Sequence, residues 1–542
     1  KKICYSLFIS SEQVKRFRSG TPSTIHSGRL ILDKEKRRRV RLISKKQQAI
    51  SSRALSFDLI NKIKEGMRYF PMCQMMVLVP AVLIGFRMYL FSQPCLHDDV
   101  VEFEITHDLS GGQGVAKVSV EPCDSFSQTY QEARMRFRES VESLGLLTHA
   151  LSVVPDQDYT MDIAVIPGGR PGLVIHTSGV HGVEGYAGSA IQVAFLHYLK
   201  KQKHEGVKWK PLPEMPTVVL VHAFNPFGMA EYRRPNEQNV DLNRNALTEQ
   251  ELQDLFHSHP NHGSYRKFDD FFNIRKPPSY FYSCFWIWVK SVSKVMGEGK
   301  GTLKAAMVGG QYYQKDGLFY GGNSVQASNR LFESWLKDYM ATLTTARTDA
   351  PIAKETTSLE NSSETNSTTP SNTPVVTWID VHTGLGPMGV DTIIVNPSSS
   401  SHPERNQRKE LSAWFPNAPS ALNAQAKSDN EVTQGYEHSR GFVVDYFGGK
   451  FFSDPDHQSF TLVQEFGTVP NLLVGHALMI ENSAFFADGL SRDEKRSWAQ
   501  RTTARAFYPQ NPTWRKAVLE RGLTLLFQAM NRSAKWGQNQ EA

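Results

Sequence analysis

Apolar residues recur along the chain at two spacings, one typical of helices and the other of strands. Between residues 125 and 145 they stand three or four positions apart, which predicts a helix with Ser125 as its N-cap and Gly145 as its end. Residues 160–167 alternate between apolar and polar, as a half-buried strand does. Helical spacing returns in residues 190–199, 281–289, 330–339, 472–486 and 517–530. The pattern predicts an α/β fold.

Short, largely apolar runs predict buried strands, and polar side chains stand at or just after the ends of several of them. The runs cover residues 173–175, 217–223, 375–382, 390–395 and 460–463. Three of these strands lead to His181, His382 and Glu465. In open α/β sheets, ligands bind at the carboxyl ends of the strands. We therefore expect a ligand site where these three side chains meet.

The composition is that of a globular protein with a basic tail. The 542 residues, 40% of them hydrophobic, are enough to bury a large core. The net charge of +7 is misleading, because residues 1–70 hold 18 Lys and Arg against 5 Asp and Glu, and all later residues hold 43 against 49. We predict a disordered basic leader over residues 1–70 and a folded part that binds no nucleic acid.

Residues 71–94 form a candidate signal or anchor segment. Residues 75–86 are a run of twelve apolar positions, and residues 88–91 resume it after one arginine. The run is short for a membrane span of about 20 residues but suits the core of a signal peptide or a marginal anchor. A buried helix or strand is the alternative. The segment favours the secretory pathway, or membrane anchoring through residues 75–91, over a cytoplasmic location.

The remainder, residues 95–542, is predicted to form one domain with two interruptions. Residues 246–340 form a long aromatic and glycine-rich insertion. Residues 341–374 are rich in Thr, Ser, Asn and Glu and nearly lack large apolar side chains, which predicts a disordered loop. The loop carries glycosylation sequons at Asn361 and Asn366, which apply only in the secretory pathway.

The residues at the predicted strand ends suit a metal ion. His181 and Glu184 stand three apart in a glycine-rich turn, and His382 would supply a third ligand. Two imidazoles and one carboxylate leave Zn²⁺ a fourth position for water, as in catalytic sites, whereas His-x-x-Glu alone is more often a surface turn. The five cysteines are scattered without Cys-x-x-Cys spacing, which argues against a thiolate site and a disulfide framework.

Further polar residues are candidates for catalysis around such an ion. Glu465 could take a proton from the water, although a salt-bridged or capping glutamate is the alternative. Asp380 could accept a hydrogen bond from a ligand imidazole, or lie in a peripheral turn. Either Arg233 or Arg234 could donate to an oxyanion. Asn243 and Arg244 could bind a substrate carboxylate. For any of these arginines taken alone, the alternative is a solvated basic loop.

Taken together, these motifs resemble the zinc carboxypeptidase (M14-like) superfamily, and more closely its DUF2817 branch, over residues 120–490. The resemblance rests on Ser178-Gly-Val-His-Gly-Val-Glu-Gly185, Asn225-Pro-Phe-Gly228, Arg233-Arg234, Asn239-Val-Asp-Leu-Asn-Arg244, Gly321-Gly322, Asp380-Val-His-Thr-Gly-Leu-Gly386 and Glu465-Phe-Gly-Thr468. It implies a mixed, mostly parallel twisted sheet flanked by helices and one Zn²⁺ ion. The implied ligands are His181, Glu184 and His382. The implied general base is Glu465.

The resemblance also implies a substrate with a free carboxylate. Asn243 and Arg244 would bind that carboxylate, and Arg233 or Arg234 would stabilise the oxyanion. The chain departs from the superfamily at Val183, where an arginine is common. The motifs do not assign a substrate-capping tyrosine, for which Tyr436 and Tyr446 are the candidates. The sequence therefore leaves three hypotheses open: a carboxypeptidase, a deacylase of N-acyl amino acids or small amides, and a metal-free binding protein.

Overall fold

The computed structural model describes residues 101–105, 116–202, 210–275, 278–279, 286–348, 375–394, 415, 435–436, 438–452, 459–486 and 492–535. All of them belong to one compact unit, residues 80–542. The predicted leader at 1–70, the signal or anchor candidate at 71–94 and residues 349–374 of the predicted loop lie outside the described residues. Within the described residues, no helix is both long and apolar enough to cross a membrane.

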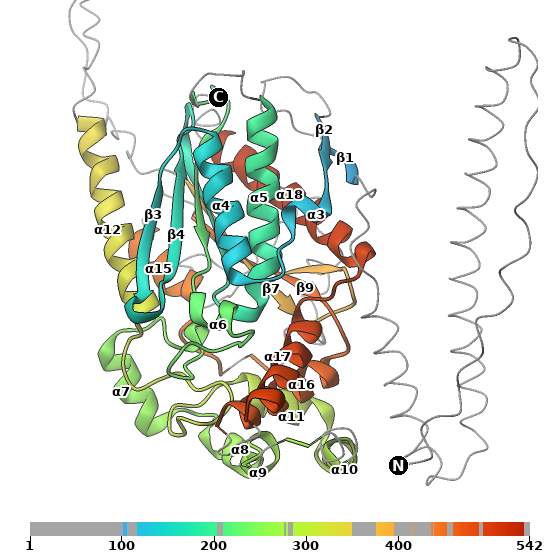
Figure 1. Cartoon of the computed structure of the whole chain (residues 1–542). Helices are drawn as coiled ribbons and strands as arrows, with labels where there is room; N and C mark the ends of the chain where they lie inside the picture. The colour runs from blue at the N-terminus through green and yellow to red at the C-terminus, as the bar shows by residue number, and fades with distance from the viewer. Residues whose placement is uncertain are drawn as a thin grey trace, which may run out of the picture. The chain divides into compact units, whose positions relative to one another are not determined.

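A seven-stranded mixed sheet runs through the described part of the chain (Figure 1). In spatial order its strands are β3 (Thr148–Val154), β4 (Tyr159–Ile166), β6 (Pro216–His222), β5 (Arg170–Ser178), β7 (Val376–Gly384), β9 (Phe460–Gly467) and β8 (Asp391–Ile394). The four strands β6, β5, β7 and β9 are parallel, and antiparallel strands flank them on both sides. The mixed α/β sheet confirms the predicted fold class. A separate antiparallel pair joins β1 (Val101–Ile105) to β2 (Ala116–Val120).

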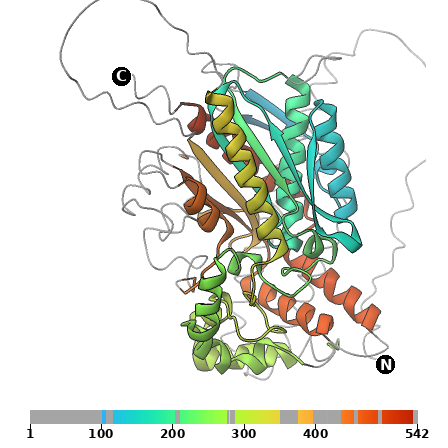
Figure 2. The same ribbon diagram turned by 90° about the vertical axis from the view of Figure 1, so that its left-hand side faces the viewer.

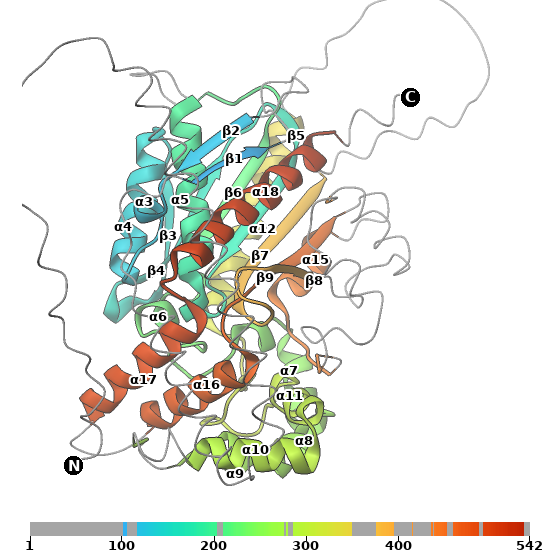
Figure 3. The ribbon, with the colours of Figure 1, turned by 90° about the vertical axis from the view of Figure 1, so that its right-hand side faces the viewer.

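Helices cover both faces of the sheet, because the central strands are apolar on both sides. The first face packs against α4 (Tyr130–Ser143), α5 (Gly185–Gln202) and α18 (Pro512–Lys535), and the other against α12 (Ala327–Thr348) and α15 (Val443–Phe452) (Figures 2 and 3). Neighbouring residues of β5 alternate accordingly: Val174 joins the first core cluster, while Leu173 and Ile175 join the second. The apolar runs of the sequence are thus buried strands.

A third group of helices lies at the end of the sheet where the parallel strands finish (Figure 3). It comprises α6 (Pro226–Ala230), η3 (Leu242–Arg244), α7 (Glu249–Ser258), α8 (His262–Lys267), α9 (Asp269–Phe272), α10 (Ile287–Glu298), α11 (Lys300–Val308), α16 (Asn471–Phe486) and α17 (Arg492–Phe507). The helices α8 to α11, α16 and α17 share a third apolar cluster. The predicted insertion 246–340 therefore supplies much of the structure beside the expected ligand site.

The structure corrects the start of the first predicted helix. Ser125 ends a short helix, α3 (Pro122–Ser125), and α4 begins only at Tyr130. Thr129 is the N-cap, because its hydroxyl accepts a hydrogen bond from the Glu132 amide at 3.2 Å. The predicted end is confirmed: Gly145, just past the helix, has φ of 74°, a conformation that glycine adopts without strain.

Two further features differ from the sequence-based expectations. The predicted disordered loop begins later than residue 341, because α12 continues to Thr348 through helix-favouring residues such as Ala341 and Leu343. In addition, Cys123 in α3 is disulfide-bonded, whereas the cysteine spacing argued against a disulfide framework. A single disulfide needs no spacing motif, so the cysteine pattern could not reveal it.

Two buried histidines are expected to make the fold acid-sensitive. Burial lowers the pKa of His176 and of His222 to about 4, so the folded protein keeps both neutral while the unfolded chain takes up protons below about pH 6.5. Stability is therefore lost as the pH falls from 6.5 towards 4. At pH 5 we expect a loss of about 2 kcal/mol per histidine in the free energy of unfolding, measured with urea and a chelator present.

The contribution of His222 can be isolated with one substitution. His222→Asn should show a smaller loss of stability between pH 7 and pH 5 than the unaltered protein. The matched control is His257→Asn, since His257 is exposed on α7 and lies outside the core. Equal pH dependence in all three proteins would contradict the assignment.

Candidate metal centre

The ends of three parallel strands bring the predicted site residues together. After β5, His181 leads into a tight turn, η2 (Gly182–Glu184), before α5 begins. On the next strand, His382 of β7 lies opposite Glu465 of β9 in the parallel register. Gly182 is required in the turn, because a Cβ atom there would lie 2.0 Å from the backbone of Gly228. The turn can therefore pack directly on α6.

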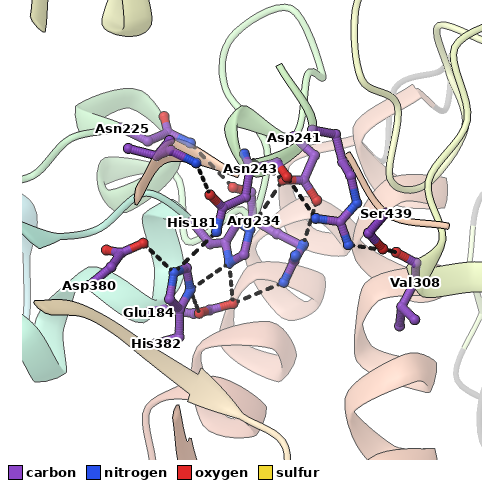
Figure 4. A network of polar contacts seen from close by, with 12 residues as sticks. His181, Glu184, Asn225, Arg234, Asp241, Asn243, Val308, Asp380, His382 and Ser439 are labelled. Carbon is purple, nitrogen blue, oxygen red and sulfur yellow. Dashed lines mark hydrogen bonds and ion pairs between the residues drawn. The ribbon is translucent and has the colours of Figure 1, made fainter. Parts of the chain in front are cut away.

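Three side chains converge at this point with metal-ligand atoms close together (Figure 4). The Nδ1 atom of His382 lies 2.9 Å from Nδ1 of His181 and 2.9 Å from Oε2 of Glu184. Nδ1 of His181 lies 3.1 Å from Oε1 of Glu184. One potential ligand atom from each residue falls within 4.8 Å of the others, and all three residues are buried. We call this group the His-Glu-His cluster.

Each histidine of the cluster is oriented by a carboxylate on its outer side. The Nε2 atom of His181 lies 3.1 Å from Oδ1 of Asp241, and that of His382 lies 2.7 Å from Oδ2 of Asp380. A proton on each Nε2 donates to the carboxylate and leaves the Nδ1 lone pair facing the cluster. Two imidazole lone pairs and a carboxylate directed at one point suit a divalent cation, so the residues fit the zinc ion implied by the sequence.

The charges within the cluster are strongly coupled. Burial alone would lower the pKa of His382, but the charge and hydrogen bond of Asp380, followed by those of Glu184, hold it well above its usual value. Burial would raise the pKa of Glu184, yet the two histidines lower it strongly. The carboxylate of Glu184 is therefore ionised at any physiological pH, as a metal ligand requires.

Glu465 lies beside the cluster and lines the same cavity. Its Oε1 atom accepts a hydrogen bond of 2.8 Å from the Leu385 amide. Burial, and then the negative charge of Glu184, raise the pKa of Glu465 to about 7. A carboxyl group of this kind exchanges protons near neutral pH, which is the property needed in a general acid or base.

The two neighbouring arginines have different positions. Arg234 lines the cavity; its Nη1 donates to Oε1 of Glu184 at 3.1 Å and its Nε donates to Oδ2 of Asp241 at 3.0 Å. Arg233 forms an ion pair of 2.6 Å with Glu481 and stacks over the ring of Phe485. The structure therefore brings Arg234 to the cluster and directs Arg233 away from it.

Asn243 and Arg244 belong to η3 and also line the cavity. The Nδ2 atom of Asn243 lies 3.2 Å from Nε2 of His382, and its Oδ1 accepts a hydrogen bond from the Val443 amide. The guanidinium of Arg244 is buried and donates to the carbonyls of Asn243 and Val308, while its Nε has no hydrogen-bond partner among the described residues. A buried polar atom without a partner calls for an explanation, and an anionic ligand in the adjoining cavity is one candidate.

The structure adds one site residue, Asp241, and separates the two candidate tyrosines. Asp241 joins His181 to Arg234, a role that its position in the Asn-Val-Asp-Leu-Asn-Arg motif could have suggested. Of the two tyrosine candidates, Tyr436 lines the cavity. The hydroxyl of Tyr446 instead accepts a hydrogen bond from Lys450, and Tyr446 is not among the cavity-lining residues.

Removing the charge of Asp380 is expected to weaken metal binding. Asp380→Asn should reduce zinc affinity by about 10–100-fold, because the imidazole of His382 loses its negatively charged partner. Affinity can be measured by competition with a chelating dye. Asp162→Asn is the matched control, since Asp162 is equally buried but pairs with Arg138 outside the cavity. Equal affinities in both variants would contradict the role of Asp380.

The fold and the cluster together define a class: an α/β protein with a buried His-Glu-His site, suited to a divalent metal, at the carboxyl ends of parallel strands. The family described as "Protein of unknown function (DUF2817)" matches residues 126–348 and 354–521. The chain belongs to this family, which confirms the branch expected from the motifs.

Comparison with solved structures gives further matches. Bovine thrombin-activatable fibrinolysis inhibitor, in complex with tick carboxypeptidase inhibitor, is 12% identical over 74% of this chain and 99% of its own, with a TM-score of 0.35. A candidate metallopeptidase from Shewanella baltica OS155 is 13% identical over 71% of this chain and 96% of its own, with a TM-score of 0.30. Another, from Shewanella denitrificans OS217, is 13% identical over 69% and 89%, with a TM-score of 0.26. No curated protein matches significantly.

Proposed function

We propose that the protein is a zinc-dependent hydrolase of amide bonds, most closely of the metallocarboxypeptidase type. The observation that carries the proposal is the His-Glu-His cluster, which is buried, oriented by two outer carboxylates and open to a cavity that also contains Glu465. A zinc ion at such a site supplies a Lewis acid and lowers the pKa of bound water towards about 7. His181, Glu184 and His382 would hold it.

In this proposal, separate residues of the chain transfer the proton, stabilise the oxyanion and orient the imidazoles. Glu465, which lines the cavity beside the cluster, takes the proton of the attacking water and passes it to the leaving nitrogen. Arg234, beside Glu184, donates to the oxygen that becomes negatively charged during the attack. Asp241 and Asp380 would accept the Nε2 protons and keep each imidazole in the orientation that directs Nδ1 at the ion.

Arg244 is the group that we assign to the substrate carboxylate. Its buried guanidinium lies in the cavity wall. The neighbouring Asn243 is held in place by its contacts with His382 and Val443. A peptide with a free C-terminus and an N-acyl amino acid both place a carboxylate next to an amide. The same site therefore accommodates either, and the metal-free binding hypothesis is the alternative to both.

Blocking the carboxylate is expected to abolish the reaction. Peptides and acyl amino acids with an amidated C-terminus should be hydrolysed at least about 100-fold more slowly than the free acids, because Arg244 loses a charge-assisted contact. Arg244→Lys should reduce this discrimination mainly by raising KM for the free acids. The measurement is kcat/KM of the zinc-loaded protein on paired substrates. Equal rates on free and amidated substrates would remove Arg244 from substrate binding.

A further inference from the structure

The cavity that contains the His-Glu-His cluster extends well beyond it. Its volume is about 1380 Å³, larger than the roughly 300–1,000 Å³ of ordinary small-molecule sites. Most of its wall is apolar, and the apolar part includes Phe272, Val295, Leu303, Met307, Leu478 and Met479. We call the space bounded by these six residues the apolar chamber. The whole cavity is therefore much larger than the chemistry at the cluster requires.

The apolar chamber is formed by the segment between residues 246 and 340 together with α16. Helices α9, α10 and α11 supply Phe272, Val295, Leu303 and Met307, and α16 supplies the remaining two. These helices lie at the same end of the sheet (Figure 3). Val295 and Met307 pack against the third apolar cluster yet are only half-buried, because part of each side chain faces the cavity. The segment 246–340 therefore forms a wall of the substrate cavity.

The character of this wall selects between the two substrate types. A peptide lying along the six apolar side chains would place its backbone N–H and C=O groups against carbon atoms that offer no hydrogen bond, which is costly. The polar lining residues of the same helices, such as Ser291, Lys304 and His476, stand between these apolar positions. A hydrocarbon chain has no such groups, and each methylene that leaves water adds to the binding free energy. The polar groups for a head group, Arg244 and Arg234, line the same cavity as the cluster.

We propose that the apolar chamber binds the hydrocarbon chain of a long-chain N-acyl amino acid, whose carboxylate lies on Arg244. The proposal rests on the proposed amide hydrolysis and names its substrate class. Water adds its oxygen to the carbonyl carbon, the carbon–nitrogen bond breaks, and the nitrogen receives a proton through Glu465. The products are a fatty acid and a free amino acid.

Gly475 of α16 offers a way to shorten the chamber without touching the cluster. It lines the cavity, and a Cβ atom there would meet only Met307, at 3.9 Å from Cε and 4.0 Å from Sδ. Those are ordinary van der Waals distances, so alanine fits. A leucine at this position would extend past Met307 into the chamber.

The test compares acetyl, octanoyl and dodecanoyl derivatives of one amino acid on the zinc-loaded full chain. We expect kcat/KM to rise with chain length, by up to roughly fourfold per methylene. Gly475→Leu should lose at least about tenfold on the dodecanoyl substrate while acetyl turnover stays unchanged, and Gly475→Ala should behave like the unaltered protein. No dependence on chain length, or equal losses on all substrates in Gly475→Leu, would overturn the proposal.

A second readout separates this proposal from the proposed hydrolysis. A fluorescent fatty acid should bind the unaltered protein and the Gly475→Ala variant, and dodecanoate should displace it. Its affinity for the Gly475→Leu variant should be at least about tenfold weaker. If no amide substrate is hydrolysed but this binding pattern is found, the proposed hydrolysis is wrong and the proposed binding of a hydrocarbon chain in the apolar chamber is supported. If fatty acid binding is absent or insensitive to Gly475→Leu, the chamber is wrong whatever the turnover.

Discussion

Replacing Glu465 with glutamine is expected to reduce amide hydrolysis by about 10²–10⁴-fold while zinc remains bound. Glutamine has the size of glutamate and can still accept the hydrogen bond that the Leu385 amide donates at 2.8 Å. It cannot remove a proton from water. Since Glu465 lies outside the three residues whose ligand atoms converge, its substitution leaves the cluster complete. The measurement is kcat together with the zinc content of the same preparation.

The matched control for this substitution is Glu481→Gln. Glu481 is also a buried glutamate, but it pairs with Arg233 outside the cavity, so its loss should lower stability and leave kcat nearly unchanged. Turnover by Glu465→Gln at the rate of the unaltered protein would remove Glu465 from the mechanism. Loss of zinc from that variant would instead make Glu465 part of the metal site.

Replacing His382 with alanine is expected to abolish both zinc binding and hydrolysis. Its Nδ1 atom is the one that lies closest to both other members of the cluster, at 2.9 Å from each. Loss of a direct ligand should weaken zinc binding by more than the roughly 100-fold that follows loss of an orienting carboxylate. Without bound zinc, hydrolysis should fall to the background rate. Zinc affinity and kcat/KM are both measured.

A control for the loss of a histidine as such is His257→Ala. His257 is exposed on α7 and should affect neither quantity. Because removal of His382 leaves Oδ2 of the buried Asp380 without its imidazole partner, circular dichroism should show that the variant is folded. A folded His382→Ala protein with unchanged zinc affinity would place the metal elsewhere.

The central strands could be predicted from sequence because they are buried on both faces. Residues 173–175 and 218–221 are apolar without interruption, and such runs predict a core strand. The edge strand β3 was missed, since most of its residues are exposed or half-exposed and include His149 and Ser152. A strand could therefore be predicted where both of its faces are buried, because the sequence is then an apolar run.

The His-Glu-His cluster could be predicted because its members follow strands that end at one edge of the sheet. Which of two adjacent arginines enters the site could not, because Arg233 and Arg234 have the same chemistry and differ only in direction. The apolar chamber was also beyond the sequence. It depends on how helices from the segment 246–340 pack against α16, and apolar helices of that kind more often form an ordinary core.

The most direct test is the metal content of the purified full chain, measured by elemental mass spectrometry after equilibration with zinc and removal of excess ion. The account predicts close to one zinc per chain, and none in His382→Ala. A full chain that retains no divalent metal, or that retains the same amount when His382 is replaced, would contradict the central claim that His181, Glu184 and His382 hold a catalytic zinc ion.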